Sequence, residues 1–302
     1  MKVLVTGVNG FVGHHLASEL VAAGHEVVGA GLGSVSPGLA EILADYLECD
    51  LVQGWPGVDV EAVVHLAALS AVGPSFADPQ RYIAANSAPI THLGEFQLAS
   101  GRQSRVVVVS TGAIYGANDG EPLSEASPMV PTSPYAVSKM LNEAQCAYYR
   151  RRGVDVVVMR PFNHIGPGQG PGFILPDLVA GLLEARQTGA VLRVGNLDTR
   201  RDYTDVRDVV RAYRLALESP TVGVPVLNVC SGQSVSGREI LETAAEVLEQ
   251  AVPTVEVDDK RLRPDDPLEV RGDNRGIRST LGWSPTIALE RSVRDFVQSM
   301  TQ

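Results

Sequence analysis

The stretch Lys2-Val3-Leu4-Val5-Thr6-Gly7-Val8-Asn9-Gly10-Phe11-Val12-Gly13 predicts the fold of this chain. The valine-rich run at residues 2–6 is typical of a strand buried on both faces. It leads directly into three glycines spaced three apart, and residues 14–23 then have the pattern of a helix. A strand, a glycine turn and a helix in this order predict a dinucleotide-binding unit. An ordinary tight turn is the alternative interpretation.

Each glycine has a separate purpose in such a unit. Gly7 allows the tight turn, Gly10 allows a pyrophosphate to approach the backbone, and Gly13 lets the helix pack on the strand. The positive end of the helix then faces the phosphates.

Apolar strands alternate with helical segments along the first half of the chain. We expect strands at residues 25–30, in a short region ending at 50–51, and at 62–66, 105–109 and 154–159. We expect helices at residues 81–100 and from 134 to about 152. This alternation predicts an α/β fold with a Rossmann-type, doubly wound parallel sheet and right-handed crossovers.

The turn after the second strand leaves the form of the dinucleotide open. An acidic residue there usually binds the adenosine ribose, and a basic one accepts a 2′-phosphate. This chain has Gly31-Leu32-Gly33-Ser34 instead, so NAD and NADP remain alternatives. Ser34 or Ser36 is able to hydrogen-bond either form, and both are also ordinary loop residues.

Further along the sheet, Asp50-Leu51 is a candidate for contact with the adenine. The small side chains of Ala67-Ala68 let a ligand approach the backbone. We expect His65, within a buried strand, to be a packed core histidine.

A second motif, Ser133-Pro134-Tyr135-Ala136-Val137-Ser138-Lys139, predicts an acid–base site. Ser133 caps a helix that starts at Pro134, so Tyr135 and Lys139 emerge on one face. An ammonium one turn away is expected to favour the phenolate and lower the pKa of Tyr135 from its usual value of about 10. A partly buried tyrosine beside a solvated lysine is the alternative, although the chain has only three lysines.

Ser110-Thr111 follows the strand at residues 105–109, at the end of the sheet where ligands of α/β folds gather. Thr111 is therefore a candidate to hydrogen-bond a substrate oxygen, or else it caps the strand end.

The composition changes after residue 160. Residues 161–171 are too rich in proline and glycine for a regular element, and we interpret them as a domain junction and substrate-lining loop. Helices are expected near residues 174–186, 206–217, 237–248 and 289–300, and strands near 191–194, 226–229 and 254–257. The prediction is a dinucleotide-binding domain at 1–160 and a smaller, mixed α/β substrate lobe at 161–302, with residues 203–230 packing back on the first domain.

Arginines in this half fall in predicted loops, at Arg200-Arg201 and at Arg261 and Arg263. Solvated side chains are the default expectation for them. Placed across a cleft from the glycine turn, they would instead suit bidentate capture of a diphosphate.

Composition excludes several classes of partner. A net charge of −10 argues against nucleic acid or an anionic membrane surface. No apolar run is long enough to span a bilayer, and residues 3–5 are too short for a signal peptide. The three scattered cysteines, Cys49, Cys146 and Cys230, predict neither disulfides nor a metal site and suit a cytoplasmic protein.

Together, the three glycines, Ser110-Thr111, the Tyr135/Lys139 pair and the segment from Arg160 resemble the extended short-chain dehydrogenase/reductase family. This family, also described as NAD-dependent epimerases/dehydratases, contains nucleotide-sugar epimerases, dehydratases and reductases. Longer blocks resemble the GDP-4-keto-6-deoxy-D-mannose reductases, at residues 160–169, 194–209, 228–232 and 261–264.

The resemblance implies a catalytic triad of Thr111, Tyr135 and Lys139. Tyr135 would give a proton to the sugar's C4 oxygen as hydride arrives, Lys139 would hold the cofactor ribose, and Thr111 would position the oxygen. The implied cofactor-lining residues are Gly7, Gly10, Phe11, Val12, Gly13, Asp50, Leu51, Leu66, Ala67, Ala68, Asn86, Tyr135, Lys139 and Pro161. The implied substrate contacts are Thr111, Asn163, Arg201 and Arg263.

One departure narrows the chemistry. Related dehydratases, and many of these reductases, carry an acidic residue shortly after the catalytic Ser or Thr, where this chain has Gly112-Ala113. Dehydration needs a group that moves a proton at C5, whereas reduction and C4 epimerisation do not.

The leading interpretation is therefore NAD(P)H-dependent reduction of the 4-keto group of a nucleotide-activated, GDP-linked 6-deoxyhexose, as in deoxysugar biosynthesis. An NAD-dependent nucleotide-sugar epimerase and a non-catalytic, nucleotide-sensing relative are the alternatives. The resemblance also implies a homodimer formed through the helices at residues 81–100 and 135–152.

Overall fold

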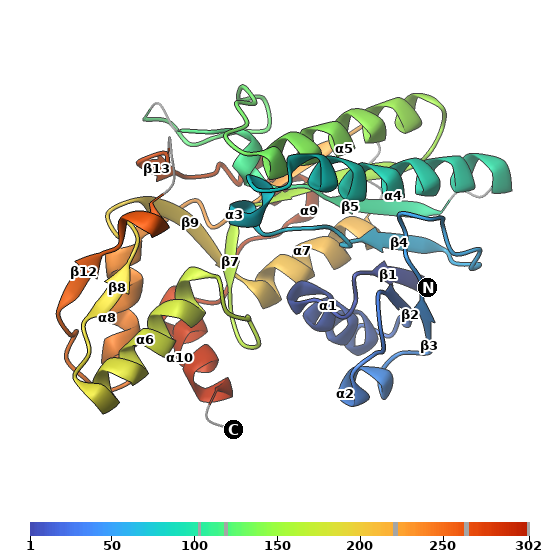
Figure 1. Ribbon diagram of the computed structural model, residues 1–302. Coiled ribbons are helices and arrows are strands. Elements are labelled where there is room, and N and C mark those ends of the chain that lie inside the picture. The colour runs from blue at the N-terminus through green and yellow to red at the C-terminus, as the bar shows by residue number, and fades with distance from the viewer. Residues whose placement is uncertain (102–103, 118–119, 220–222, 263–265, 301–302) are drawn as a thin grey trace.

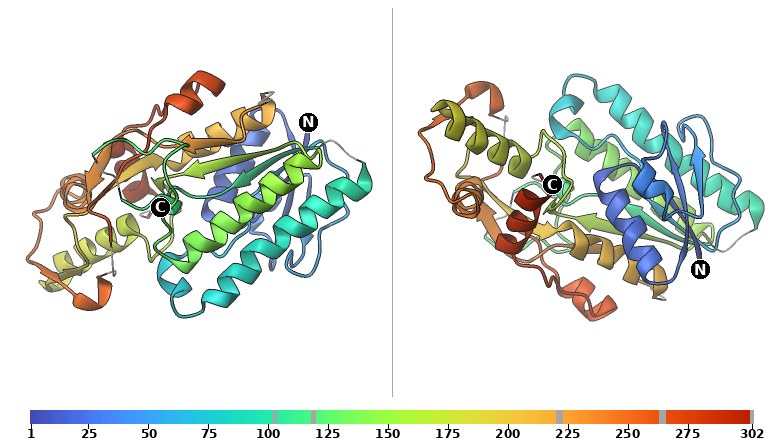
Figure 2. Two further views of the ribbon diagram at one scale, coloured as in Figure 1. Left: turned by 90° about the horizontal axis from the view of Figure 1, so that it is seen from above. Right: turned by 90° about the horizontal axis from the view of Figure 1, so that it is seen from below.

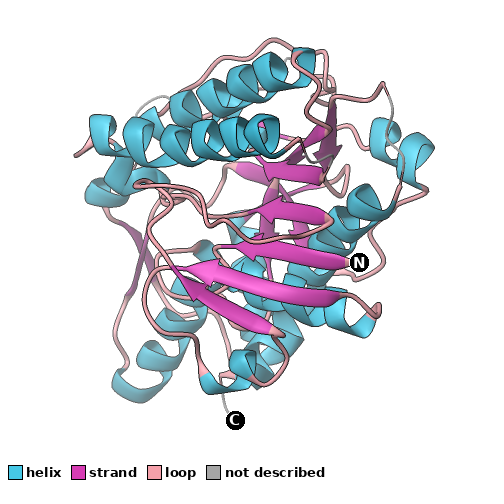
Figure 3. Ribbon diagram, turned by 90° about the vertical axis from the view of Figure 1, so that its right-hand side faces the viewer, coloured by secondary structure: helices cyan, strands magenta, loops and turns pink. Residues whose placement is uncertain are grey.

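Seven parallel strands form the central sheet of the computed structural model, in the order β3-β2-β1-β4-β5-β6-β10 (Figures 1 and 3). The structure describes residues 1–101, 104–117, 120–219, 223–262 and 266–300. The strands are β1 (Lys2–Thr6), β2 (Glu26–Gly31), β3 (Asp45–Glu48), β4 (Ala62–His65), β5 (Arg105–Val109), β6 (Val156–Pro161) and β10 (Val226–Val229). The predicted Rossmann-type α/β fold is confirmed.

Helices cover both faces of this sheet. Alternate residues of each strand pack into two separate hydrophobic cores, one on each face. Val3 and Val5 pack toward the face with α1 (Phe11–Ala22), α2 (Pro37–Ala40), α7 (Val206–Glu218) and α9 (Arg275–Leu281). Leu4 packs on the opposite side, under α4 (Pro79–Ser100) and α5 (Pro134–Arg151), with α3 (Val72–Ser75) beside them. Figure 1 shows α4 and α5 side by side above the sheet and α1 and α7 below it. Burial on both faces explains why these strands are almost wholly apolar.

Several boundaries differ from those expected. The first helix begins at Phe11 rather than at residue 14, because Gly10 in extended conformation is its N-cap. The third strand ends at Glu48, so Asp50 and Leu51 lie in the turn that follows it. The short helices α2 and α3 were not predicted, since four residues carry no helical periodicity.

A second lobe contains its own apolar core. Its helices are α6 (Ile174–Thr188), α8 (Gly237–Val247) and α10 (Leu289–Ser299). Its strands are β7 (Asn163–Ile165), β9 (Arg200–Asp205), β11 (Ser234–Ser236) and β13 (Glu269–Val270) in one sheet, and β8 (Leu192–Val194) with β12 (Val255–Val257) in another. The 3₁₀ turns are η1 (Gly112–Ile114) and η2 (Asp259–Arg261). Both views in Figure 2 show this lobe at one end of the central sheet.

Two predictions about this half are wrong. Residues 163–165 form strand β7 within the segment that we expected to be irregular, and Arg200 and Arg201 lie in strand β9 rather than in a loop. The two strands pair with each other across about 40 residues of sequence, so no local pattern reports the pairing.

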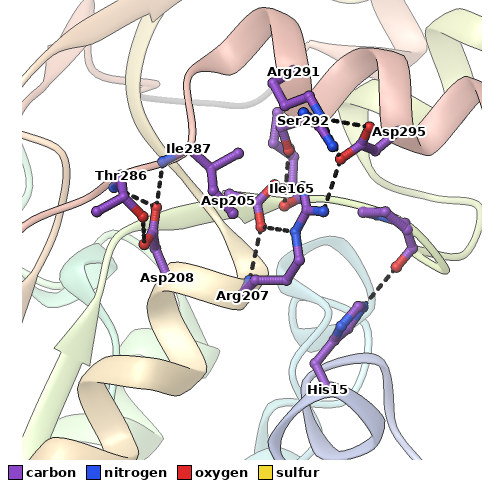
Figure 4. A network of polar contacts seen from close by, with 11 residues as sticks. His15, Ile165, Asp205, Arg207, Asp208, Thr286, Ile287, Arg291, Ser292 and Asp295 are labelled. Atoms are coloured by element: carbon purple, nitrogen blue, oxygen red, sulfur yellow. Dashed lines mark hydrogen bonds and ion pairs between the residues drawn. The ribbon is translucent and has the colours of Figure 1, made fainter. Parts of the chain in front are cut away.

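Polar contacts at the start of α7 hold the C-terminal segment in place (Figure 4). Asp205 accepts a hydrogen bond from the Arg207 backbone N–H at 2.8 Å and forms an ion pair with its guanidinium, which also reaches Asp295 of α10 at 2.7 Å. Asp208 accepts hydrogen bonds from the backbone N–H groups of Thr286 and Ile287, each at 2.8 Å. The chain returns from the second lobe to the central sheet through α7 and β10. These contacts hold the start of α7 against α10 and against residues 286–287.

Candidate active site

The strand order reverses at β1, which pairs with β2 on one side and β4 on the other. Ligands of open α/β sheets bind at the carboxyl ends of the strands beside such a reversal. Gly7 follows β1 at this point with a φ of +70°, and a Cβ on it would lie 2.8 Å from the Ala67 amide nitrogen. Only glycine therefore fits between the two strand ends.

The other two glycines of the motif shape the start of α1. A Cβ on Gly13 would lie 2.4 Å from the Gly7 carbonyl oxygen, so this glycine lets the helix approach the turn. Gly10 is exposed, and a Cβ there would approach only the Gly7 oxygen, at 3.2 Å. No side chain caps the helix. An uncapped helix N-terminus beside an exposed glycine fits the diphosphate of a dinucleotide, with Phe11 and Val12 in the first turn.

Asn9 and Tyr46, which the sequence analysis missed, hold the turn after β2. The Asn9 side-chain amide donates to the Leu32 carbonyl at 3.1 Å and to the Tyr46 hydroxyl at 2.8 Å. The Tyr46 hydroxyl donates to the Gly33 carbonyl at 2.6 Å. Neutral groups therefore shape the turn at which dinucleotide folds contact the adenosine ribose.

The remaining residues predicted to line a cofactor differ in their exposure. Asp50 is exposed, and Leu51 is buried. Leu66, Ala67 and Ala68 are partly buried after β4.

Asn86 is completely buried in α4 and holds the loop that follows β4. Its side chain bonds the Leu69 backbone N–H at 2.8 Å and carbonyl at 3.1 Å, and it donates to Ser138 Oγ at 2.9 Å. Its contacts join this loop to the helix that carries Tyr135.

The three predicted catalytic residues meet at the end of β5. Ser133 accepts a hydrogen bond from the Ala136 N–H and caps α5, as expected. Tyr135 lies near the Thr111 side chain, which acts to lower the pKa of the phenol. Lys139 is almost fully buried, and its Nζ donates to the Val109 carbonyl at 2.9 Å.

The predicted effect of Lys139 on Tyr135 is wrong for this structure. Burial raises the pKa of Tyr135 to about 12, against the lowering effect of the Thr111 side chain. Burial also lowers the pKa of Lys139 to about 8. Tyr135 is therefore a protonated phenol at neutral pH, because it loses water while the ammonium of Lys139 bonds Val109.

His65 is a buried core residue, as predicted. Its Nδ1 lies 2.8 Å from Thr6 Oγ1, and 1% of the residue is exposed. Burial, followed by the charge of Lys139, lowers the pKa of His65 to about 3. His65 is therefore neutral at physiological pH.

The Phe162 ring accounts for the glycine at position 112, whereas the neighbouring Ala113 is exposed. A Cβ on Gly112 would lie 2.8–3.0 Å from three carbon atoms of the Phe162 ring. No larger side chain fits there unless the ring moves.

The segment after Pro161, the last residue of β6, contacts the glycine turn. The rings of Phe11 and His164 are stacked with centroids 6.1 Å apart. His15 of α1 lies 2.8 Å from the Pro167 carbonyl through Nε2 (Figure 4). The segment thereby links the lobe to the start of α1.

Two of the predicted substrate residues lie on paired strands. Asn163 is exposed on β7 beside Tyr203 of β9, two residues beyond Arg201 on the same face. The Arg201 guanidinium is largely buried and pairs with Asp266 at 2.6 Å, so the expectation of a solvated side chain is wrong for it. Arg263 lies outside the described residues.

A buried ion pair between Glu143 and Arg160 also escaped the sequence analysis. The spacing of Glu143, four residues after Lys139, was the available signal that it shares the buried face of α5.

Among the described residues, no group of three or more His, Cys, Asp or Glu side chains is placed to hold a metal ion. No described helix combines the length and the apolar character needed to cross a membrane.

The fold is a Rossmann-type α/β fold with a glycine turn of the dinucleotide-binding kind, and Thr111, Tyr135 and Lys139 meet at the end of β5. The sequence model of the NAD dependent epimerase/dehydratase family matches residues 3–230. The chain belongs to this family, and its resemblance to extended short-chain dehydrogenases/reductases is confirmed.

Two of its relatives have different named activities. The chain is 35% identical to the GDP-6-deoxy-D-mannose reductase of Pseudomonas aeruginosa, over 97% of this chain and 95% of that protein. It is 34% identical to the UDP-glucose 4-epimerase of Mycolicibacterium smegmatis, over 99% and 98%.

Two solved structures are similar to this chain over almost its whole length. MoeE5 in complex with UDP-glucuronic acid and NAD is similar with a TM-score of 0.88 and 30% identity, over 100% of this chain and 99% of that one. RMD from Pseudomonas aeruginosa, complexed with NADPH, is similar with a TM-score of 0.83 and 31% identity, over 99% and 98%.

Proposed function

We propose that this protein reduces the 4-keto group of a nucleotide-activated 6-deoxyhexose, with GDP as the expected nucleotide and NAD(P)H as the reductant. The observation that carries the proposal is the 35% identity with the GDP-6-deoxy-D-mannose reductase of Pseudomonas aeruginosa over 97% of this chain. A ketone reductase needs an acid that donates a proton to the carbonyl oxygen, and Tyr135 is a protonated phenol at neutral pH.

Each catalytic residue then has a definite task. The cofactor, when bound, supplies the hydride that reaches C4. Thr111 holds the C4 oxygen next to Tyr135, and Tyr135 donates its proton to that oxygen, so the ketone becomes a secondary alcohol. Lys139 holds the cofactor ribose and places a positive charge near the phenolate that forms.

The substrate's diphosphate is assigned to the lobe. Asn163 and Arg201 lie on paired strands. Arg263 matches a position that binds the nucleotide-sugar phosphates in the family, so it would supply a second arginine. Arg201 already pairs with Asp266, so a substrate phosphate would share or replace that partner.

An epimerase that oxidises and then reduces C4 is the second candidate. The observation that favours it is the 34% identity with the UDP-glucose 4-epimerase of Mycolicibacterium smegmatis. Dehydration is not proposed, because neither Gly112 nor Ala113 carries the acidic side chain that the family's dehydratases use.

The test supplies purified protein with NADPH or NADH and a GDP-4-keto-6-deoxyhexose. We expect stoichiometric oxidation of the cofactor and a GDP-6-deoxyhexose product. A folded protein that binds cofactor but leaves this substrate unchanged contradicts the proposal. Interconversion of UDP-sugars with no net use of cofactor would establish the epimerase instead.

A single substitution separates an enzyme from a nucleotide-binding relative without catalysis. Tyr135→Phe removes the proton donor and is expected to lower kcat about 100- to 10,000-fold, with cofactor binding retained. The matched control is Tyr148→Phe, on the same helix but 45% exposed, and it should keep full activity. Equal activity of the two variants would refute the assignment of Tyr135.

A further inference from the structure

Three consecutive residues at the end of β5 contact three residues on one face of α5. The helix residues are four apart, so they lie one above the other. The contacts pair Val109 with Lys139, Ser110 with Glu143 and Thr111 with Tyr135. The Ser110 hydroxyl donates to Glu143 Oε1 at 2.5 Å. Glu143 therefore makes one of the three contacts that set the position of α5 against the end of β5.

Arg160 of β6 forms an ion pair with the same Glu143 carboxylate. Its Nε lies 2.9 Å from Glu143 Oε1, and its Nη2 lies 2.6 Å from Oε2. The Arg160 side chain is 5% exposed and the Glu143 side chain is 9% exposed. Arg160 Nη1 also donates to the Tyr115 hydroxyl, which donates to Asn228 Oδ1. A bidentate ion pair of this kind fixes the orientation of the Glu143 carboxylate as well as its distance from Arg160.

The titratable neighbours of Lys139 come from three elements. They are Tyr135, Glu143 and Cys146 on α5, His65 on β4, and Arg160 on β6 behind Glu143. Burial lowers the pKa of Lys139, and interactions with Cys146 and Glu143 oppose that effect.

Of these neighbours, Glu143 is the one with a carboxylate, which forms a buried ion pair with Arg160. Burial raises the pKa of Cys146 to about 12, so its thiol stays neutral. His65 is neutral, because burial lowers its pKa to about 3.

We propose that Glu143 is a positioning residue, which holds α5 against the end of β5 and keeps Lys139 as an ammonium. The effect of Glu143 on turnover rests on the proposed function, whereas its effect on the titration of Lys139 does not. Glu143 touches neither substrate nor cofactor in this proposal; it acts through Lys139 and through the register between helix and strand.

The first test measures Lys139 without turnover. The chain has three lysines, so protein labelled with ¹³C at lysine Cε gives three signals, and Lys139→Met identifies the signal of interest. Wild-type Lys139 should titrate near pH 8. Glu143→Gln should lower that midpoint by about one pH unit, since it removes the adjacent anion.

Glu95→Gln is the matched control. Glu95 pairs with Arg152 at 3.3 Å and is 56% exposed, and it joins α4 to α5 without reaching Lys139. It should leave the Lys139 midpoint unchanged.

The second test follows kcat against pH with the substrate established for the enzyme. Glu143→Gln should lower kcat about 100-fold, as expected for a small misplacement of reacting groups. Its alkaline limb should move to lower pH together with the Lys139 midpoint. An inactive wild type would refute the proposed function alone, because the titration of Lys139 is measured without substrate.

A single substitution leaves Arg160 unpaired in the interior, so the double variant Glu143→Gln, Arg160→Gln is measured beside it. This variant buries no isolated charge and should still show the lowered Lys139 midpoint. A folded single or double variant with the wild-type Lys139 midpoint would overturn the proposal. So would a kcat–pH profile identical to that of Glu95→Gln.

Discussion

Gly7→Ala offers a sharp test of the packing at the dinucleotide site. The structure sets two separate costs for the new methyl group. The φ of +70° is left-handed, and an alanine there costs about 1–2 kcal/mol. The methyl would also lie 2.8 Å from the Ala67 nitrogen and 2.9 Å from its Cα, and overpacking against backbone costs about 1–3 kcal/mol more.

Gly189→Ala separates these costs. Gly189 ends α6 with a φ of +71°, and its Cβ would meet nothing within 4 Å. It carries only the conformational cost, about 1–2 kcal/mol. Gly7→Ala should therefore lower the free energy of unfolding by about 2–5 kcal/mol, and the difference between the variants isolates the close approach of the two strand ends.

The assay is equilibrium unfolding in urea for both variants, with titration of NAD and NADP in the native state. Gly7→Ala should also weaken dinucleotide binding, because Ala67 must move away from the turn, whereas Gly189→Ala should not. Equal losses of stability and unchanged binding would refute the idea that Gly7 and Ala67 shape the site together.

Three further predictions concern His65, Gly112 and α5. The folded-state pKa of His65 is about 3, below the 6.5 of an unfolded histidine, so the unfolded chain binds an extra proton between these values and stability falls as pH falls through this window. His65→Gln should remove about 1.4 kcal/mol per pH unit from the slope of unfolding free energy between pH 6 and 4; an unchanged slope would contradict the buried, neutral histidine. Gly112→Ala should destabilise by about 1–3 kcal/mol through contact with the Phe162 ring, whereas Gly54→Ala, whose Cβ would meet nothing within 4 Å, should be nearly neutral in the same urea titrations. The homodimer stays a prediction, and we expect α5 to form it, because Val137, Leu141 and Tyr148 are 42%, 39% and 45% exposed on that helix. Leu141→Arg should then give a monomer in sedimentation, and a wild-type monomer at working concentration would refute the dimer.

Local patterns accounted for the central sheet and for the helix that carries Tyr135 and Lys139. The strand-glycine-helix motif and the spacing of Tyr135 and Lys139 are contained within a few residues, and helical or strand periodicity determines which side chains share a face. The predictions that failed depend on partners far away in the chain. Strand β7 forms because it pairs with β9, and neither strand has a pattern that reports the other.

The sequence by itself therefore determined the fold class and the residues that meet at the end of β5. The tertiary structure decided their protonation and their partners. Burial raises the pKa of Tyr135 and lowers that of Lys139, because many segments together exclude water from both. The same packing directs Lys139 to Val109 and closes the space beside Gly112 with Phe162. Desolvation and steric exclusion are properties of the assembled core, so residue spacing alone does not encode them.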